Sequence, residues 1–334
     1  MYEAFYRFSG IPFLLTPDTR FFFGSSGHSR AISHLVFGLS QEEGFIVITG
    51  EVGAGKTTLV EQLWSQLDRN TYVMARVVTT QVSGDDLLRL ILANFGLGET
   101  PGTDKATLLR RFEHMVRDQR RLGRRVLLVV DEVQNLSLGA LEELRMLSNI
   151  TVDGRASVQT ILLGQPQFRP ILASKDVEQL RQRVLASYHL GPLTEDETRL
   201  YIEHRLRTVG WRDNPHWTDG AFAAVFRQTG GIPRRINTLC SRVLLYGALE
   251  EAHDISAGMV DTTAAELLQD LGTAIPPDEE AGAAAREPSS ADTTAANYSA
   301  LLHRIETLEQ AAVRRDRMFR RILDALGAGV EARR

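Results

Sequence analysis

The chain has 334 residues, of which 43% are hydrophobic and 24% charged, a composition ordinary for globular proteins and long enough for two domains. Its formal net charge of -4 excludes a protein that is basic overall, so nucleic acid or anionic lipid would have to bind a local basic patch. Cys240 is the single cysteine, which excludes an internal disulfide and favours a reducing, cytoplasmic compartment. The N-terminus lacks the pattern of a secretion signal and no apolar stretch is long enough to cross a bilayer, so we expect no transmembrane segment.

An N-terminal arm and a first helix are predicted over residues 1–43. Aromatic residues are frequent in 1–24, and Pro12 and Pro17 disfavour a long helix there, so we expect an ordered arm lying on the following domain. The aromatic side chains either cover a core, which we favour, or form a wall for an adenine ring. Apolar residues at helical spacing predict a helix over 29–39, and His28 before it either contacts a nucleotide or caps this helix.

Residues 44–59, GFIVITGEVGAGKTTL, predict a strand, a glycine-rich loop and a helix that starts near Lys56. Gly50, Gly55, Lys56 and Thr57 fit the pattern G-x-x-x-x-G-K-[ST] of a triphosphate-binding loop, and an apolar strand precedes it. Its glycines permit backbone conformations closed to other residues, so that N–H groups turn toward phosphate. Lys56 is expected to reach the β- and γ-phosphates and Thr57 to bind Mg²⁺. The predicted ATP-binding residues are Gly50, Glu51, Val52, Gly53, Ala54, Gly55, Lys56, Thr57 and Thr58.

Alternating helices and strands are predicted after this loop: helices over 57–67, 85–95 and 103–122, and a strand over 72–79. Arginines gather on and after the last of these helices. A basic surface of this kind binds phosphate backbones, but we favour a solvated helix face because no stacking aromatic residues lie among the arginines. The arginines are Arg110, Arg111, Arg117, Arg120, Arg121, Arg124 and Arg125.

Two carboxylates end the next strand. Residues 126–134, VLLVVDEVQ, are apolar without alternation up to the acids, as in a strand buried on both faces of a parallel sheet. Asp131 and Glu132 then lie at the carboxyl edge of the sheet, where ligands bind in open α/β folds. We predict that Asp131 binds Mg²⁺ through water and that Glu132 orients and deprotonates the attacking water.

Further candidates follow a predicted helix over 137–148. A buried strand over 158–163 brings Gln165 to the same edge, where its amide either contacts the γ-phosphate or the attacking water, or is a polar turn residue. A helical segment over 177–184 carries Arg181 and Arg183 before a last strand over 186–190. Each arginine is either a finger for a neighbouring subunit's nucleotide or a solvated charge.

A small helical domain is predicted over 194–271, because no further apolar strand run appears there. Thr194 and Glu197 have the spacing of a capping box at the start of its first helix. Arg234 and Arg235 lie just inside a later helix start, after Pro233. A cation is unfavourable at a helix N-terminus, so we infer that one of these arginines faces an anion.

The last part of the chain predicts a linker and a helix. Residues 272–297 are rich in proline, alanine, serine and acids, which predicts a disordered linker. Residues 298–326 carry apolar residues at alternating steps of four and three, the pattern of a coiled coil, before a tail over 327–334. The alternative is an amphipathic helix that binds a partner or anionic lipid. The repeating positions are Leu301, Ile305, Leu308, Ala312, Arg315, Phe319, Ile322 and Leu326.

Over residues 1–270 the chain resembles the AAA+ ATPases of the general secretion pathway protein A (ExeA-like) family, especially its shorter members found with exosortase and exopolysaccharide gene clusters. The resemblance rests on YEAFYRF, PFLLTPDTRFFF, GFIVITGEVGAGKTT, LLVVDEVQNL, LLGQPQF, LRQRV, YHLGPL and GGIPRRIN. It implies an α/β fold with a P-loop AAA+ parallel sheet flanked by helices over 44–193 and a helical lid over 194–271, while the coiled-coil tail is expected from the spacing of residues 301–326 alone. The longer relatives also carry a transmembrane segment and a peptidoglycan-binding region, which we do not expect here.

The resemblance also implies residue roles. Gln165 departs from the Asn or Thr that is common at sensor 1 in AAA+ proteins. The implied roles are Walker A for Lys56 and Thr57, Walker B for Asp131 and Glu132, sensor 1 for Gln165, the finger for Arg181 or Arg183, and sensor 2 for Arg234.

The implied function is Mg²⁺-dependent ATP hydrolysis that powers or regulates assembly of an envelope secretion or exopolysaccharide export system. We expect a homo-oligomer in the cytoplasm whose partners are envelope export proteins, with peripheral contact at the inner membrane left open. Two alternatives are a DNA-binding ATPase of the transposition-regulator kind, motivated by the arginines of 110–125, and a nucleotide-gated scaffold with little turnover.

Overall fold

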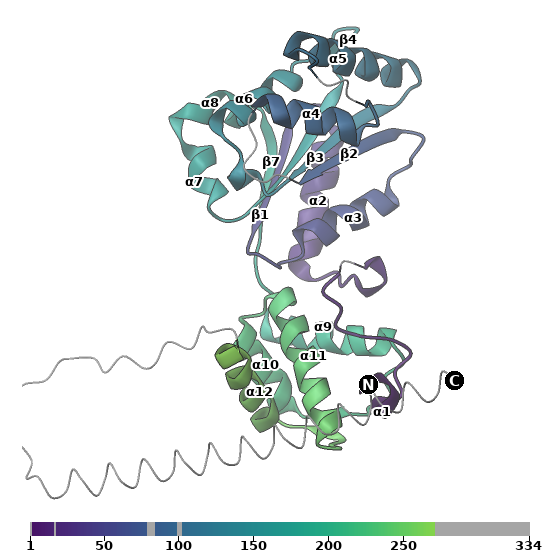
Figure 1. The fold of residues 1–334 in the computed structure, drawn as a ribbon, viewed down its shortest axis with the longest axis vertical. Helices are drawn as coiled ribbons and strands as arrows, with labels where there is room; N and C mark the ends of the chain where they lie inside the picture. The colour runs from purple at the N-terminus through teal and green to yellow at the C-terminus, as the bar shows by residue number, and fades with distance from the viewer. Residues whose placement is uncertain (1, 17, 79–83, 99–101, 271–334) are drawn as a thin grey trace, which may run out of the picture. The chain divides into compact units, whose positions relative to one another are not determined.

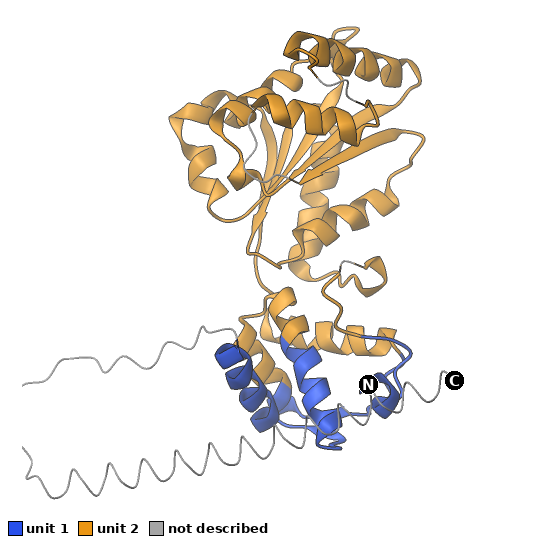
Figure 2. Ribbon diagram, viewed as in Figure 1, with its two compact units in different colours: residues 1–11, 210–221, 239–334 blue, residues 12–209, 222–238 orange. Residues whose placement is uncertain are grey.

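The computed structural model describes residues 2–16, 18–78, 84–98 and 102–270 (Figure 1). Contacts divide the chain into two compact units (Figure 2). The sheet unit comprises residues 12–209 and 222–238, and the C-terminal unit comprises 1–11, 210–221 and the described residues from 239 onward. The predicted linker over 272–297, the coiled coil over 298–326 and the tail over 327–334 lie outside the described residues.

A five-stranded sheet with the order β2-β3-β6-β1-β7 forms the centre of the sheet unit. Each neighbouring pair is parallel, as the unbroken apolar runs predict. The three inner strands are buried along nearly their whole length, whereas the edge strands β2 and β7 are partly exposed. The strands are β1 (Phe45–Gly50), β2 (Tyr72–Val78), β3 (Arg125–Asp131), β6 (Val158–Gly164) and β7 (Val184–Leu190).

Helices cover both faces of this sheet, which confirms the predicted α/β fold (Figure 1). Successive strand residues point to opposite faces, so Val129 and Val130 of β3 belong to different core clusters. The Val129 face is covered by α2 (Ser26–Ser40) and α3 (Lys56–Gln66), and the Val130 face by α4 (Gly84–Asn94), α5 (Lys105–Arg121) and α6 (Leu138–Leu147). The same pairing brings the carboxyl ends of the strands to one edge.

Shorter elements and the later helices complete the described chain. The predicted capping box is confirmed: Thr194 Oγ1 accepts from the N–H of Glu197, and a Glu197 carboxylate oxygen accepts from the N–H of Thr194, each at 3.2 Å. The remaining elements are α1 (Tyr2–Tyr6), η1 (Thr19–Phe21), η2 (Val133–Asn135), β4 (Thr151–Val152), β5 (Arg155–Ala156), α7 (Phe168–Ala173), η3 (Lys175–Val177), α8 (Glu178–Arg181), α9 (Glu195–Thr208), β8 (His216–Trp217), α10 (Asp219–Thr229), α11 (Pro233–Leu249), β9 (Asp254–Ile255) and α12 (Ala257–Asp270).

Two details differ from the sequence predictions. The helix predicted over 177–184 ends at Arg181, because Val184 already pairs with Phe45 as the first residue of β7. The described residues of the predicted helical domain, 194–270, are mainly helical, but β8 and β9 form a two-residue parallel pair in the C-terminal unit, too short to produce a recognisable pattern. None of the helices in the described ranges combines the length and apolar character that crossing a bilayer requires.

The N-terminal arm has a different partner in each unit. In the sheet unit the buried Arg205 of α9 donates to the carbonyl oxygens of Pro12 (2.8 Å) and Leu14 (3.4 Å), and its guanidinium lies 5.0 Å from the centre of the Phe21 ring. This supports the packing interpretation of the aromatic residues.

The first residues of the arm do not lie on the domain that follows them, so that part of the prediction was wrong. They belong to the C-terminal unit, where the Tyr6 hydroxyl donates to the carbonyl of Ala252 at 3.0 Å. Gly247 of α11 leaves room for this ring, because a Cβ there would stand 2.5 Å from the Tyr6 hydroxyl. Such a long-range fit leaves no local pattern in the sequence.

Candidate nucleotide site

The glycine-rich loop joins β1 to α3 at the carboxyl edge of the sheet. Gly53 and Gly55 have φ of +83° and +97°, in the left-handed region that favours glycine, as predicted. For Gly50 the predicted reason was wrong, because its φ lies outside that region. A Cβ on Gly50 would instead stand 2.6 Å from the carbonyl oxygen of Leu190, so glycine is needed for the close approach of β7.

The N-terminus of α3 opens onto this loop. α3 begins at Lys56, and no side chain of the described residues caps it, because its N-cap residue is Gly55. Its first N–H groups and the positive end of the helix dipole are therefore suited to bind an anion. Lys56 Nζ donates to the carbonyl oxygens of Gly50 (2.7 Å) and Glu51 (3.0 Å), which places the ammonium beside the loop.

The ammonium of Lys56 is buried, and burial lowers its pKa from the ordinary value. The negative charges of Glu132, Asp131 and Glu51 oppose that shift. The lysine is thus a cation taken partly out of water among acids, a site suited to a highly charged anion.

Thr57 and Asp131 meet across the site. Thr57 Oγ1 donates to Asp131 Oδ2 at 2.9 Å, and the Asp131 residue is only 3% exposed at the end of β3. A hydroxyl and a carboxylate are hard oxygen ligands of the kind that Mg²⁺ takes in small numbers beside water and phosphate. These two residues therefore fit the predicted metal-binding role.

Glu132 follows in a left-handed backbone conformation, with φ of +57°. For a residue with a Cβ this conformation costs about 1–2 kcal/mol, and such strain gathers at functional sites. Glu132 Oε2 accepts one hydrogen bond from Gln134 Nε2 at 2.6 Å and another from Gln165 Nε2 at 2.9 Å. The backbone N–H of Gln165 donates to Gln134 Oε1 at 2.9 Å, so the two amides and the carboxylate form one network.

These contacts set the ionisation of Glu132. Burial opposes the charged form, but the hydrogen bonds from Gln165 and Gln134 and the charge of Lys56 outweigh it, so the pKa of Glu132 lies below its ordinary value. The carboxylate is therefore ionised at neutral pH and able to accept a proton from a nearby water.

Arg234 reaches the loop from the start of α11. Its backbone N–H donates to the carbonyl oxygen of Gly53 at 3.2 Å. A Cβ on Gly53 would stand only 2.3 Å from the Cβ of Arg234, so the two backbones approach as closely as a glycine allows. The predicted lid arginine thus lies at the phosphate loop, within the sheet unit.

His28 lies against the same loop. Ser25, and not His28, caps α2: Ser25 Oγ accepts from the N–H of His28 at 3.2 Å and lies 2.7 Å from its ring Nδ1. His28 Nε2 would be 2.8 Å from a Cβ on Gly55. Burial lowers the pKa of His28, with the charge of Glu197 opposing, so the ring is neutral at physiological pH.

The two finger candidates lie elsewhere. The carbonyl of Arg183 accepts from the N–H of Phe45 at 2.9 Å, at the amino end of β1 and so at the opposite edge of the sheet from Gly50. Its guanidinium contacts the carbonyl (3.4 Å) and hydroxyl (3.1 Å) oxygens of Ser148, the C-cap of α6. Arg181 donates to the carbonyl of Ala173 at 2.9 Å. Neither side chain is brought to the loop of its own chain.

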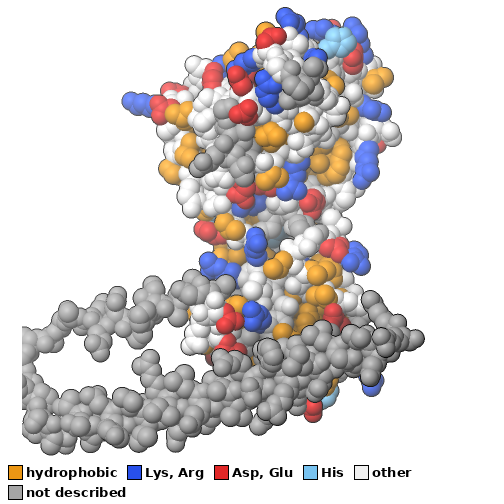
Figure 3. Space-filling model, viewed as in Figure 1, with side chains coloured by type: hydrophobic (Ala, Val, Ile, Leu, Met, Phe, Trp, Pro, Cys, Tyr) orange, Lys and Arg blue, Asp and Glu red, His pale blue; other side chains and the backbone are white. Residues whose placement is uncertain are grey.

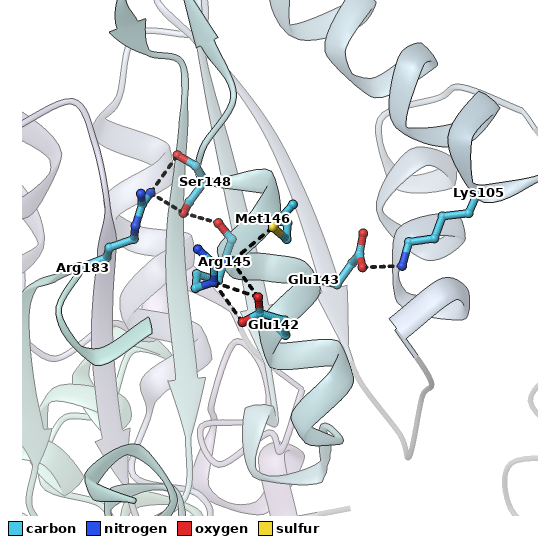
Figure 4. A network of polar contacts seen from close by, with 7 residues as sticks. All are labelled: Lys105, Glu142, Glu143, Arg145, Met146, Ser148 and Arg183. Carbon is cyan, nitrogen blue, oxygen red and sulfur yellow. Dashed lines mark hydrogen bonds and ion pairs between the residues drawn. The ribbon is translucent and has the colours of Figure 1, made fainter. Parts of the chain in front are cut away.

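Figure 4 shows how Arg183 is tied to α6. The Ser148 hydroxyl donates to the carbonyl of Arg145 at 2.7 Å, and Arg145 pairs with Glu142 on the same helix. The buried Glu143 points the other way and pairs with Lys105 of α5 at 2.7 Å. These contacts give Arg183 a structural role at the end of α6.

Arginines at the end of α5 and just after it have acidic neighbours. Arg125 pairs with Glu42, Arg120 lies 3.9 Å from the same carboxylate, and Arg121 lies 3.5 Å from Asp118. Basic and acidic side chains are also interspersed on the face drawn in Figure 3. The favoured interpretation, a solvated helix face, accords with these pairs, and nucleic-acid binding stays a prediction.

Two residues of the site were missed from the sequence. Gln134 lies two positions after Glu132, where the only signal was an amide in the turn after the strand. Arg76 of β2 donates to Asp131 Oδ2 at 2.9 Å, and its signal was a lone charge inside the apolar run YVMARVVT. A charge in such a run needs a partner, and the available partner was the acid that ends the next strand.

Known proteins resemble this chain in sequence. The AAA domain family matches residues 39–172, which include the loop, both acids and Gln165. The chain is 35% identical over 279 residues to General secretion pathway protein A of Aeromonas hydrophila, an alignment that covers 82% of this chain and 50% of that protein. The chain therefore spans about half the length of this relative.

Solved structures share the fold. Cdc6p from Pyrobaculum aerophilum has a TM-score of 0.62 at 15% identity, covering 82% of this chain and 74% of that chain. The Aeropyrum pernix ORC1 protein, solved in complex with DNA, has a TM-score of 0.54 at 15% identity, covering 76% of this chain and 69% of that chain. At such identities the likeness concerns the fold alone.

Proposed function

The chain is an AAA+ ATPase of the general secretion pathway protein A (ExeA-like) family, and from this premise we propose that it uses Mg²⁺-dependent ATP hydrolysis to power or regulate assembly of a cell-envelope secretion or exopolysaccharide export system. The observation that carries the hydrolytic mechanism is the pair of hydrogen bonds that Gln134 and Gln165 donate to Glu132. The identity to General secretion pathway protein A supports the cellular role.

In the proposed mechanism the loop and Lys56 bind the phosphates. Glu132 accepts a proton from a water whose oxygen attacks the γ-phosphorus, while the bond from that phosphorus to the β,γ-bridging oxygen breaks and ADP leaves. Gln134 and Gln165 orient the carboxylate, and Arg234 contributes positive charge from the lid. A Mg²⁺ ion bound by Thr57 and Asp131 would neutralise charge on the phosphate oxygens.

We also propose that the site is completed in a homo-oligomer. Both arginines before β7 contact their own chain, and we assign the finger to Arg181 because it is exposed, whereas Arg183 is partly buried against Ser148. The side chain of Arg181 is 44% exposed, which suits an approach to a neighbouring subunit's nucleotide. We place the protein in the cytoplasm, with its partners at the inner membrane.

The amide network around Glu132 leads to a pH prediction. Gln134→Leu and Gln165→Leu each remove a hydrogen bond that lowers the pKa of Glu132, so that pKa should rise. Because the carboxylate is the active form, ATPase activity is lost as the pH falls through this pKa. The acidic limb of the profile of kcat against pH should therefore move to higher pH in both variants. The shift should be about one pH unit for each 1.4 kcal/mol by which the ionised carboxylate of Glu132 is destabilised.

The measurement is kcat against pH from acid to neutral conditions. Gln167→Leu is the matched control, since Gln167 is an exposed glutamine in the same turn and should leave the limb in place. An unmoved limb in both test variants, or a limb displaced to lower pH, would contradict the proposed base.

The cellular role is tested by capture of partners in a defined nucleotide state. Glu132→Gln with ATP should retain envelope secretion or polysaccharide export proteins, because the bound state persists when hydrolysis is blocked. Lys56→Ala, which loses phosphate contacts, is the control and should release them. Equal capture by both variants would contradict nucleotide-dependent assembly, and capture of DNA alone would favour the transposition-regulator alternative.

A further inference from the structure

We propose that Arg76 is a built-in counter-ion of Asp131 that competes with Mg²⁺ and passes to Glu61 when the ion binds. The inference rests on the Mg²⁺ site in the proposed function and concerns how strongly that site takes the ion. Arg76 would thus act on the Mg²⁺ site from outside the glycine-rich loop, through Asp131.

The sheet register brings Arg76 to the metal-binding side. Arg76 pairs with Val129 across β2 and β3, and Asp131 lies two residues further along β3, on the same face of the sheet. This is the face covered by α3, where Thr57 and Glu61 stand four residues apart and so on one side of the helix. The guanidinium therefore lies between an acid of β3 and an acid of α3.

Arg76 and Thr57 contact the same carboxylate oxygen of Asp131. Arg76 Nη2 donates to Asp131 Oδ2 at 2.9 Å, and Thr57 Oγ1 donates to the same oxygen at 2.9 Å. The other oxygen, Oδ1, accepts from the N–H of Glu132 at 3.0 Å. A divalent cation held by Thr57 and Asp131 would repel the guanidinium, so the two would compete for this carboxylate.

Glu61 offers the displaced arginine a second partner. Arg76 Nη1 already donates to Glu61 Oε1 at 3.1 Å, so leaving Asp131 would not strand an unpaired charge. Among the described residues, the buried Nε of Arg76 has no acceptor, so the guanidinium is not fully satisfied where it bridges the two acids. The arrangement therefore offers two positions for one arginine, with Asp131 paired in one and released in the other.

The experiment is a Mg²⁺ titration of fluorescent ADP binding, with Arg76→Gln and Glu61→Gln compared with the unaltered chain. In Arg76→Gln, Asp131 is available to the ion. The Mg²⁺ concentration at half-saturation should therefore fall to about one tenth of its original value, equivalent to about 1.4 kcal/mol of binding free energy. In Glu61→Gln, Asp131 is the only one of the two acidic partners that Arg76 keeps, so the Mg²⁺ concentration at half-saturation should rise by about threefold. Affinity for ADP at saturating Mg²⁺ should stay unchanged in both variants.

Two further variants are controls for fold and charge. Arg76→Lys keeps a cation beside Asp131 and should stay closer to the unaltered chain than Arg76→Gln. Arg110→Gln removes an exposed arginine of α5 and should leave the titration unchanged. A purely structural role for the pair would move Arg76→Gln and Glu61→Gln in the same direction, and opposite directions distinguish competition from general damage.

The possible results distinguish a failure of the competition by Arg76 from a failure of the proposed Mg²⁺ site. Variants that shift together, or not at all, while the unaltered chain depends on Mg²⁺ would overturn the competition and leave the Mg²⁺ site standing. Loss of ADP affinity at saturating Mg²⁺ in Arg76→Gln would also overturn it, by making Arg76 a phosphate ligand. Binding by the unaltered chain that is independent of Mg²⁺ would overturn the metal site and the inference together.

Discussion

Replacing Gly53 with alanine is expected to weaken ATP binding by about 10²–10³-fold. The new Cβ would stand 2.3 Å from the Cβ of Arg234, at a residue whose φ is +83°, so the loop and the start of α11 would have to separate. That movement turns the loop N–H groups away from the phosphates, and the loss of two charge-assisted hydrogen bonds at about 1.5–2 kcal/mol each gives the stated factor.

Gly123→Ala is the matched control for this prediction. Gly123 also has a positive φ, +76°, but no heavy atom of the described residues lies within 4 Å of the position its Cβ would take. It should carry only the backbone cost of about 1 kcal/mol of stability, with ATP affinity unchanged. Equilibrium binding of a fluorescent ATP analogue and thermal unfolding measure the two effects. Equal affinity in both variants would mean that α11 does not press on the loop.

The sheet and the acids at its edge were predictable because their signals are local. An unbroken apolar run such as 126–130 admits a strand buried on both faces, and the acids that follow must then emerge at the carboxyl edge. Gln165 was placed at the same edge by the same argument, and its side chain contacts Glu132. Spacing and apolar continuity therefore brought these residues together correctly.

Contacts that join distant segments left no such signal. Arg76 is isolated in sequence, and its partnership with Asp131 depends on which strands are neighbours in the sheet. The contact of Arg234 with Gly53 joins positions far apart in the chain, and its signal was only a cation in an unfavourable place at a helix start. The packing of Tyr6 near Gly247 depends on the absence of a side chain far along the chain.

Glu132→Gln is expected to lower kcat for ATP hydrolysis by about 10²–10⁴-fold, the usual contribution of a general base. The glutamine keeps the size of the side chain and an oxygen that accepts hydrogen bonds from Gln134 and Gln165, but it cannot take the proton of the attacking water. Because Lys56 and the loop are untouched, ATP affinity should remain within about threefold of the original. Glu113→Gln, an exposed acid on α5, is the control and should leave turnover unchanged.

A single-turnover experiment with ATP and Mg²⁺ tests the proposed base most directly, since it follows hydrolysis of bound nucleotide apart from product release. The unaltered chain should convert its bound ATP to ADP and phosphate, while Glu132→Gln should hold intact ATP and react about 10² times more slowly or less. Conversion by Glu132→Gln at the original rate would contradict the proposal that Glu132 is the base, and equal inactivity of both chains with ATP bound would contradict the hydrolytic mechanism as a whole.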